Sequence, residues 1–232
     1  PRGSDIKLPW ELSRCHHLLW LGEAYLITGE EKYAKEVAEE IIDWIDQNPL
    51  MYTVNWTCAM DVAIRAINWM YALLFIEKSP FFDDNLADKV YKSLYQHMFF
   101  IRNNLERNIP YSNNHYMSDL IGLLYLGAFF STTSKGHKIF KFAKKEYIKE
   151  LMIQVLPSGI NYEKSVSYHR LMTELLVYSR CMLRRIGETL PNEVETRLSK
   201  MLEYVGYYSF FNGKSPLIAD NDNGRLLPFV PR

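Results

Sequence analysis

One stretch near the middle of the chain is apolar almost all the way round a helix: Leu120-Ile121-Gly122-Leu123-Leu124-Tyr125-Leu126-Gly127-Ala128-Phe129-Phe130. A helix that is apolar on every side is stable only in a protein interior, so we expect this segment to be central. Gly122 and Gly127 would allow neighbouring helices to approach closely. The run is shorter than the ~18–20 apolar residues that cross a bilayer, so no membrane span is expected.

Helical periodicity continues on both sides of this segment. Apolar residues recur with the i, i+3, i+4, i+7 spacing of an amphipathic helix, and breakers such as Asn48-Pro49 and Pro157-Ser158-Gly159 separate the stripes. The expected helices cover approximately 8–28, 31–47, 56–78, 84–106, 114–131, 136–155, 165–186 and 192–210. No alternating strand pattern occurs before residue 215.

Helices joined by connections this short are typical of antiparallel helical hairpins, so the predicted class is all-α. An α/α toroid, in which an inner ring of helices is wrapped by an outer ring, fits the central apolar helix. A plain bundle or a solenoid fits the periodicity equally well, because no internal repeat separates the three.

Composition narrows the function. Of the 232 residues, 48% are hydrophobic and 23% charged, which is typical of a globular protein. Lys plus Arg and Asp plus Glu each number 27, and zero net charge argues against a general nucleic-acid binder. Cys15, Cys58 and Cys181 give neither a disulfide framework nor zinc spacing, so no metal site is predicted.

Two polar segments lie where helices are expected to begin. Asn114 and His115 follow Pro110-Tyr111-Ser112-Asn113, and the positive end of a helix favours anions there. The plainer alternative is an asparagine cap and a buried histidine.

Further on, Tyr168-His169-Arg170 places a phenol, an imidazole and a guanidinium within one turn. A tyrosine beside a cation or donor can serve as a base, and the alternative is a surface loop capped by a serine.

A third segment combines Asn55-Trp56 with Asp61, Arg65 and Trp69, of which the last three share one helix face. Arginine beside tryptophan suits a sugar carboxylate, whereas packed tryptophans around an Asp–Arg ion pair would be purely structural. A fourth, the turn Asp220–Arg225, fails as a calcium loop because the required carboxylate positions fall on apolar residues.

Together these segments resemble the heparinase II/III family of polysaccharide lyases. The resemblance covers nearly the whole chain and rests on the order of five segments: Pro9-Trp10-Glu11-Leu12-Ser13-Arg14, Asn55-Trp56 with Arg65, Asn113-Asn114-His115, Glu163-x-Ser165-x-x-Tyr168-His169, and Asp220–Arg225. It implies an α/α toroid over residues 1–215 and, from 216–232, a turn leading toward a β-sandwich domain that this sequence does not include.

The resemblance also implies β-elimination at a uronic acid in an acidic polysaccharide substrate. Asn114 and His115 would neutralise the uronate carboxylate, and Tyr168 would be the general base and a candidate for the acid. Substrate-binding residues would be Asn55, Trp56, Arg65, Glu163, His169 and Arg225. Further catalytic groups, including a histidine, and the structural metal of some relatives would come from the β-sandwich, so no cofactor is expected in residues 1–232. Relatives of this kind are periplasmic or secreted.

Two other functions fit the same residues. An inverting glycoside hydrolase on a toroid needs two carboxylates roughly 6.5–9.5 Å apart, for which Asp119, Glu163 and Asp220 are candidates. A non-catalytic glycan-binding protein would use the same groove without chemistry. The identity of the glycan, endolytic or exolytic action, and the oligomeric state do not follow from the sequence.

Overall fold

The computed structural model describes residues 5–108, 110–221 and 224–229. The described residues form the following helices: α1 (Lys7–Ser13), α2 (His17–Thr28), α3 (Glu31–Gln47), the short 3-10 helix η1 (Val54–Trp56), α4 (Ala59–Phe75), α5 (Asp84–Asn103), α6 (Asn114–Phe129), α7 (Ser134–Gln154), α8 (Val166–Arg185) and α9 (Asn192–Tyr208). No strand occurs among them, and an isolated antiparallel bridge pairs Val155 with Asn161. The all-α prediction is confirmed, and no helix among these residues is long and apolar enough to cross a membrane.

The chain divides into two compact units. The first unit comprises Pro1–Leu105 together with Leu227–Arg232, and the second comprises Glu106–Leu226. The final segment belongs to the first unit because Trp20 Nε1 donates to the carbonyl of Pro228 and Tyr71 packs edge-on against Phe229. The predicted domain boundary at residue 215 stays a prediction.

In the first unit, α2 contacts both α3 and α4, and α5 also contacts both of these helices. The sequence pattern explains which faces meet. On α3, the positions spaced at i, i+3, i+4 and i+7 are the buried ones, namely Ala34, Val37, Ala38 and Ile41. The helix 31–47 begins and ends where its apolar stripe predicts.

The first expected helix, 8–28, is wrong as a single element. The structure breaks it between α1 and α2 at Cys15, whose φ of 58° is left-handed and incompatible with a continuing helix. Neither glycine nor proline marks this position. Tertiary contacts offset the strain: Arg14 Nε donates to Asp61 Oδ1 at 2.6 Å, and Ser13 accepts from Arg65 at 2.8 Å.

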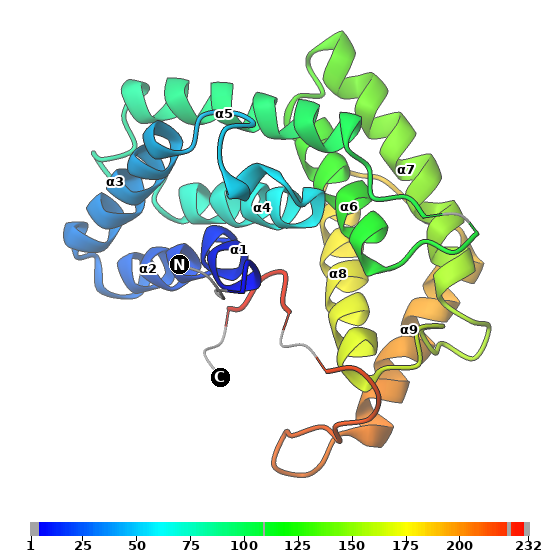
Figure 1. Ribbon diagram of the computed structural model, residues 1–232. Helices are drawn as coiled ribbons and strands as arrows, with labels where there is room; N and C mark the ends of the chain where they lie inside the picture. Colours follow the sequence, from blue (N-terminus) through cyan, green and yellow to red (C-terminus); the bar gives the residue numbers. More distant parts are fainter. Residues whose placement is uncertain (1–4, 109, 222–223, 230–232) are drawn as a thin grey trace. The chain divides into compact units, whose positions relative to one another are not determined.

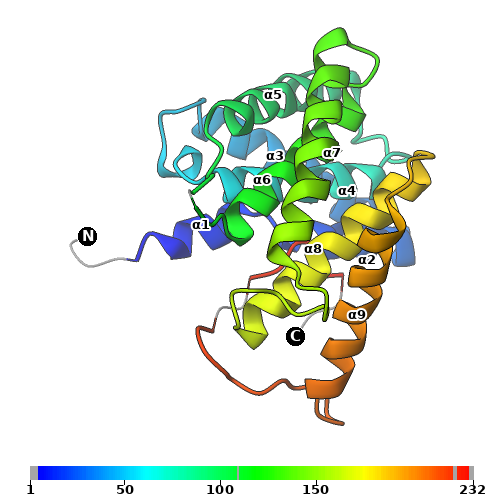
Figure 2. The same ribbon diagram turned by 90° about the vertical axis from the view of Figure 1, so that its right-hand side faces the viewer.

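The second unit is built around α6, as the apolar run predicts. Every residue from Tyr116 to Gly127 is buried. α6 contacts both α7 and α8, and α9 packs against α7 and α8 (Figures 1 and 2). At Gly127 an added Cβ would lie 2.7 Å from the backbone nitrogen of Phe140 on α7, so the expected close helix approach is confirmed there.

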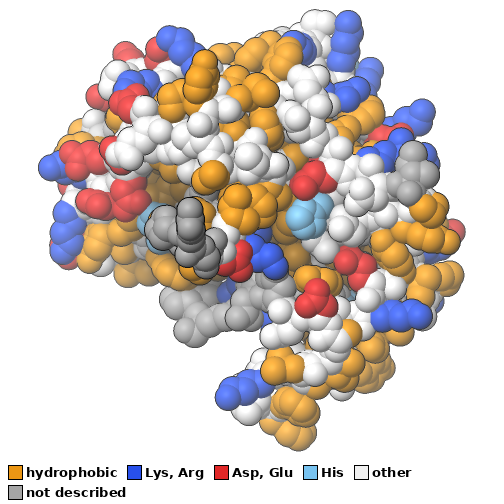
Figure 3. Space-filling view, viewed as in Figure 1, with side chains coloured by type: hydrophobic (Ala, Val, Ile, Leu, Met, Phe, Trp, Pro, Cys, Tyr) orange, Lys and Arg blue, Asp and Glu red, His pale blue; other side chains and the backbone are white. Residues whose placement is uncertain are grey.

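The outer face of α7 carries a run of lysines. Five of them are exposed and Lys144 is half-buried, so this face is solvated: Lys135, Lys138, Lys141, Lys145 and Lys149. Basic side chains gather over the upper end of α7 in Figure 3.

Replacing Gly127 by alanine tests the contact between α6 and α7. The new methyl group would collide with Phe140 backbone rather than with a movable side chain, so we expect Gly127→Ala to lower the free energy of unfolding by about 1–3 kcal/mol. The control is Gly206→Ala on α9, where no atom lies within 4 Å of the new Cβ. Urea unfolding of both variants measures the difference; equal stabilities would contradict the close approach.

Candidate functional site

Side chains accept hydrogen bonds from two backbone amides in the first turn of α6. Asn113 is the N-cap, and its Oδ1 accepts from the backbone amide of His115 at 3.2 Å. The next residue, Asn114, is 5% exposed, so its backbone amide also needs an acceptor from the protein. The sequence-predicted cap is therefore present at Asn113, and it leaves Asn114 for a different contact.

That contact is with Glu163, 49 residues later in the chain. The Glu163 carboxylate accepts from the Asn114 backbone amide at 3.2 Å and from Asn114 Nδ2 at 3.3 Å to Oε1 and 3.1 Å to Oε2. A carboxylate only accepts, so this contact fixes which end of the Asn114 amide group faces it. Glu163 thus occupies the anion-favouring end of α6.

A rigid loop places Glu163. The backbone amide of Glu163 donates to Asn161 Oδ1 at 2.9 Å, and the Asn161 amide in turn donates to Nδ1 of His169 at 3.2 Å. His169 Nε2 lies 3.3 Å from the carbonyl of Met201, to which it donates, so the ring is neutral with its proton on Nε2. His169 is 2% exposed, and burial lowers its pKa. The ring lies beside the site, with both of its nitrogens bonded to backbone.

The start of α8 presents Tyr168. Ser165 is the N-cap: its hydroxyl accepts from the Tyr168 amide at 3.1 Å and donates to the carbonyl of Asp220 at 2.6 Å. The Tyr168 hydroxyl donates to Asp220 Oδ2 at 2.8 Å. One serine therefore fixes both the helix that carries the phenol and the segment that carries its carboxylate partner.

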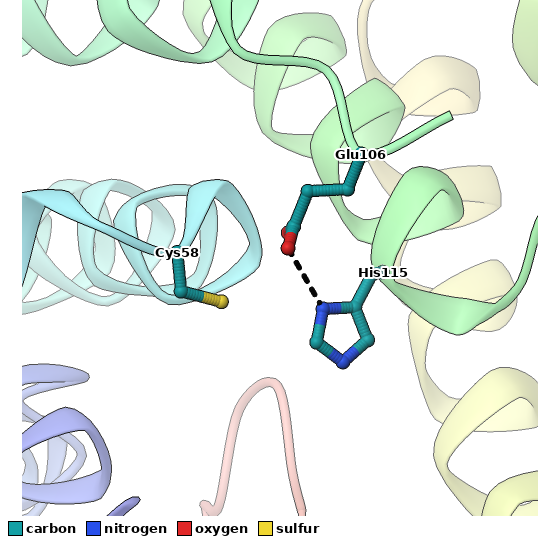
Figure 4. A group of neighbouring side chains, drawn as sticks. All are labelled: Cys58, Glu106 and His115. Carbon is teal, nitrogen blue, oxygen red and sulfur yellow. Dashed lines mark hydrogen bonds and ion pairs between the residues drawn. The ribbon is translucent and has the colours of Figure 1, made fainter. Parts of the chain in front are cut away.

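His115 is held by a carboxylate from the preceding segment. Its Nδ1 lies 3.1 Å from Glu106 Oε1, and Figure 4 shows the carboxylate directed at the ring. Both side chains are partly exposed, at 39% for His115 and 30% for Glu106. A histidine paired in this way is oriented by its partner.

We call these residues the α6 cluster: Glu106, Asn114, His115, Glu163, Tyr168 and Asp220. Within this cluster Glu163 accepts hydrogen bonds from Asn114. Burial raises the pKa of Glu163, the Asn114 hydrogen bonds and His115 lower it, and Asp220 raises it. The three residues predicted to be catalytic are therefore linked through Glu163 and Asp220. The cluster holds three carboxylates and one imidazole.

Asp119 lies on α6 one turn beyond the cluster and is fully buried. Its Oδ2 accepts from the backbone amide of Glu106 at 2.7 Å, while Oδ1 has no hydrogen-bond partner in the described part of the chain. Burial raises its pKa well above the usual value. A sealed carboxylate cannot act on a polymer, which removes Asp119 from the candidates for a hydrolase pair.

The first unit holds Asn55, Trp56 and Arg65. Arg65 is fully buried, with its guanidinium 4.1 Å from the ring centroid of Trp44 and 5.1 Å from that of Trp56. Its Nε donates to His97 Nε2 at 3.0 Å, and burial lowers the pKa of Arg65 to about 10. Burial and the Arg65 charge together keep the pKa of His97 well below its usual value.

The packed tryptophans proposed as the structural alternative are therefore present, but the ion pair differs. Asp61 pairs with Arg14 rather than with Arg65. Trp56 is 4% exposed, and its Nε1 donates to the carbonyl of Asn48 at 3.0 Å. Asn55 is half-buried and donates to Asn48 Oδ1 at 2.7 Å.

Arg225 completes the predicted set. It lies in the second unit, where its Nε is 3.4 Å from Glu174 Oε2 on α8, and the next amide, of Leu226, donates to Glu174 Oε1 at 3.0 Å. The middle of the predicted turn, residues 222–223, lies outside the described residues. Glu174 and Glu106 were missed from the sequence, because each reads as an ordinary solvated helix residue.

Known proteins match almost the whole chain. The family model described as Heparinase II/III N-terminus matches residues 1–226. A heparin-sulfate lyase of Bacteroides stercoris is 22% identical over 241 residues, which cover 93% of this chain and 35% of that protein.

Two solved structures share the fold. A heparinase III gene product superposes with a TM-score of 0.73 at 23% identity, covering 93% of this chain and 36% of its own. The heparan sulfate lyase HepC from Pedobacter heparinus gives 0.72 at 19% identity, covering 95% and 35%. The likeness supports the predicted helical-hairpin fold of the toroid class. The chain spans about a third of the length of these relatives.

Asp119 gives a stability prediction. A carboxyl group whose pKa is raised on folding stabilises the protein below its unfolded pKa and loses that contribution as the pH rises through the folded value. We expect wild-type protein to lose stability between about pH 5 and about pH 8, and Asp119→Asn to recover about 1–3 kcal/mol of that loss.

Urea unfolding at the two pH values measures this difference. The control is Asp88→Asn, an exposed carboxylate on α5 that pairs with Lys92. If Asp119→Asn and Asp88→Asn show the same pH dependence as wild type, the buried Asp119 carboxyl is not the source.

Proposed function

Because the chain belongs to the heparinase II/III N-terminal family, we propose that the protein is a polysaccharide lyase that cleaves a uronic-acid-containing glycan by β-elimination. The observation that carries the proposal is the α6 cluster, which links an amide at a helix N-terminus to a phenol through two carboxylates. Relatives named as heparin-sulfate and heparan sulfate lyases make heparan sulfate the first substrate to test.

The reaction sets a clear demand on the site. Elimination removes the proton at C5 of the uronate, which is very weakly acidic because the neighbouring carboxylate is already charged. The intermediate is an enolate dianion, and donors aimed at the carboxylate lower its energy most. Asn114 supplies an amide donor at the start of α6, where the helix dipole favours the same charge. This is the role that we propose for Asn114.

Tyr168 is the group proposed to take the C5 proton. To act as a base, the phenol must give up its own proton, and its hydrogen bond to Asp220 provides an acceptor at 2.8 Å. In the proposed step the C5–H bond breaks, the proton moves to the Tyr168 oxygen, and the phenolic proton moves to Asp220. The C4–O bond of the leaving sugar then breaks, the Tyr168 hydroxyl gives its proton to the departing oxygen and recovers one from Asp220, and a double bond remains between C4 and C5.

His115 is proposed to assist Asn114. Its pairing with Glu106 orients the ring, and as an imidazolium it would add positive charge beside the carboxylate of the substrate. Glu106 is therefore a positioning residue in this proposal.

The remaining predicted residues divide by burial. Arg225 and Asn55 are partly accessible and stay proposed substrate contacts. Trp56, Arg65 and His169 have almost no exposed surface, so we propose that they hold neighbouring segments in place rather than touch the glycan. Arg65 holds its neighbours by stacking on Trp44 and by donating a hydrogen bond to the Ser13 hydroxyl.

Substituting the phenol tests the proposed base. With heparan sulfate as substrate, we expect the full-length protein, which includes the β-sandwich domain that the resemblance implies, to raise ultraviolet absorbance, because the new double bond is conjugated with the carboxylate. Tyr168→Phe should lower the rate by about 10²–10⁴-fold, since only the hydroxyl is removed.

The matched control is Tyr207→Phe on α9, where the phenol is 84% exposed and outside the cluster. It should keep the wild-type rate. Full activity of Tyr168→Phe would remove the phenol from the mechanism. Cleavage without a double bond would instead support the hydrolase alternative.

A further inference from the structure

The α6 cluster presents an electrostatic difficulty for an acidic substrate. Asn114, the proposed donor for the uronate carboxylate, already donates to a carboxylate through both its side chain and its backbone. A uronate at this place would bring a second carboxylate against the same amide. Two carboxylates that share a site do not both stay ionised, and the proton affinity of one of them rises strongly.

The surroundings of Glu163 offer little charge to offset this repulsion. From α6 it faces Asn114 and His115, and from the segment after α9 it faces Asp220. Within its own loop, Tyr162 donates its hydroxyl to the Ser112 carbonyl and contributes no positive charge. Of the described groups that act on the Glu163 charge, His115 alone is basic, and Glu106 pairs with it.

Hydrogen bonds of the Glu163 loop also oppose a movement of this side chain away from Asn114. Its backbone amide is bound to Asn161, which is fully buried, and the loop is closed by the Val155–Asn161 bridge and by Tyr162 donating to the Gln154 carbonyl. The hydrogen bonds from Asn114 hold the Glu163 carboxylate in place and lower its pKa, so in the free protein they favour its charged form. A side chain that stays in place next to a bound uronate can relieve the repulsion only by taking up a proton.

We propose that Glu163 is the positioning residue that presents Asn114 to the uronate, and that it takes up one proton from solvent as the uronate carboxylate binds. The inference rests on the proposed function of the cluster. In the unliganded protein the Glu163 carboxylate fills the anion-favouring end of α6. In the complex the neutral carboxyl group still accepts from Asn114 through its carbonyl oxygen, and its new O–H can donate to the uronate.

The pKa of Glu163 is shifted in the direction that proton uptake requires. Burial and Asp220 already raise the pKa of Glu163 above its usual value of 4.5 in the free protein, and a bound uronate would raise it again. Binding should therefore weaken by roughly tenfold for each pH unit once the pH exceeds the pKa of Glu163 in the free protein. A wholly structural Glu163 would give no such slope.

Proton uptake can be measured directly. Titration calorimetry of a heparan sulfate tetrasaccharide into Tyr168→Phe protein, in buffers of different ionisation enthalpy, counts the protons bound without turnover. We expect net proton uptake, of at most about one proton per site, at pH values above the pKa of Glu163 in the free protein. The double variant Tyr168→Phe/Glu163→Gln should take up none, because its amide is neutral already.

Steady-state kinetics separate positioning from charge. In otherwise wild-type protein, Glu163→Gln should keep kcat within about tenfold and lose the rise of KM with pH, because glutamine still accepts from Asn114. Glu163→Ala leaves Asn114 unoriented and should lower kcat by about 10²-fold. The control is Glu188→Gln, a surface carboxylate that pairs with Lys144 and should keep the wild-type profile.

The outcomes distinguish this inference from the proposed function. Equal proton uptake by Tyr168→Phe and by Tyr168→Phe/Glu163→Gln, alongside normal formation of unsaturated product by wild-type protein, would overturn the role of Glu163 and leave the lyase standing. Proton uptake that depends on Glu163, without unsaturated product, would support the inference and refute the lyase. Absence of any binding by the folded Tyr168→Phe protein would overturn both.

Discussion

The first turn of α6 begins among buried residues, where its amides cannot rely on water. Asn113 satisfies one of them from inside the same turn, and Glu163 satisfies another from a distant loop. A buried helix start that lacks such acceptors is costly, so the fold has a thermodynamic reason to bring the loop before α8 against α6. The same contact brings a carboxylate, an amide and a phenol into one cluster. Stability of the second unit and the chemistry that we propose for the cluster thus depend on the same hydrogen bonds.

The motif Glu163-x-Ser165-x-x-Tyr168-His169 follows from this arrangement position by position. Glu163 binds the start of α6, and Ser165 caps α8 while holding Asp220. Tyr168 falls one turn into α8, within reach of Asp220, and His169 turns inward to bind the loop and α9. The serine and the imidazole hold in place the phenol and the two carboxylates, for which we propose roles in the reaction.

Much of the fold could be predicted because it depends on local pattern. The 3.6-residue stripes gave α3 its bounds, and the uniformly apolar run gave α6 its central place in the second unit. The break at Cys15 could not be predicted, since a left-handed cysteine leaves no local signal and depends on the distant pairing of Arg14 with Asp61. For the same reason the sequence placed Asp61 with Arg65: helical spacing shows which residues share a face, but not which partner arrives from another helix.

The sequence motifs indicate which residues are candidates for the site, whose roles stay predictions, but they say little about the burial of those residues. Asn114, His115 and Tyr168 were identified from motifs at helix starts, and the structure links them. Whether a polar side chain faces solvent or the core depends on long-range packing. For this reason the sequence left both a substrate-binding and a structural role open for Arg65, and His169, expected as a substrate contact, lies inside. Asp220 was visible as part of a turn, but its bond to Tyr168 spans 52 residues.

The most direct test of the whole account is a crystal structure of the Tyr168→Phe protein bound to a uronate-containing oligosaccharide. The account requires a carboxylate oxygen of the sugar within about 3.2 Å of Asn114 Nδ2, with the C5 carbon facing residue 168. A sugar whose carboxylate lies elsewhere, with Asn114 still bound to Glu163 alone, would contradict it.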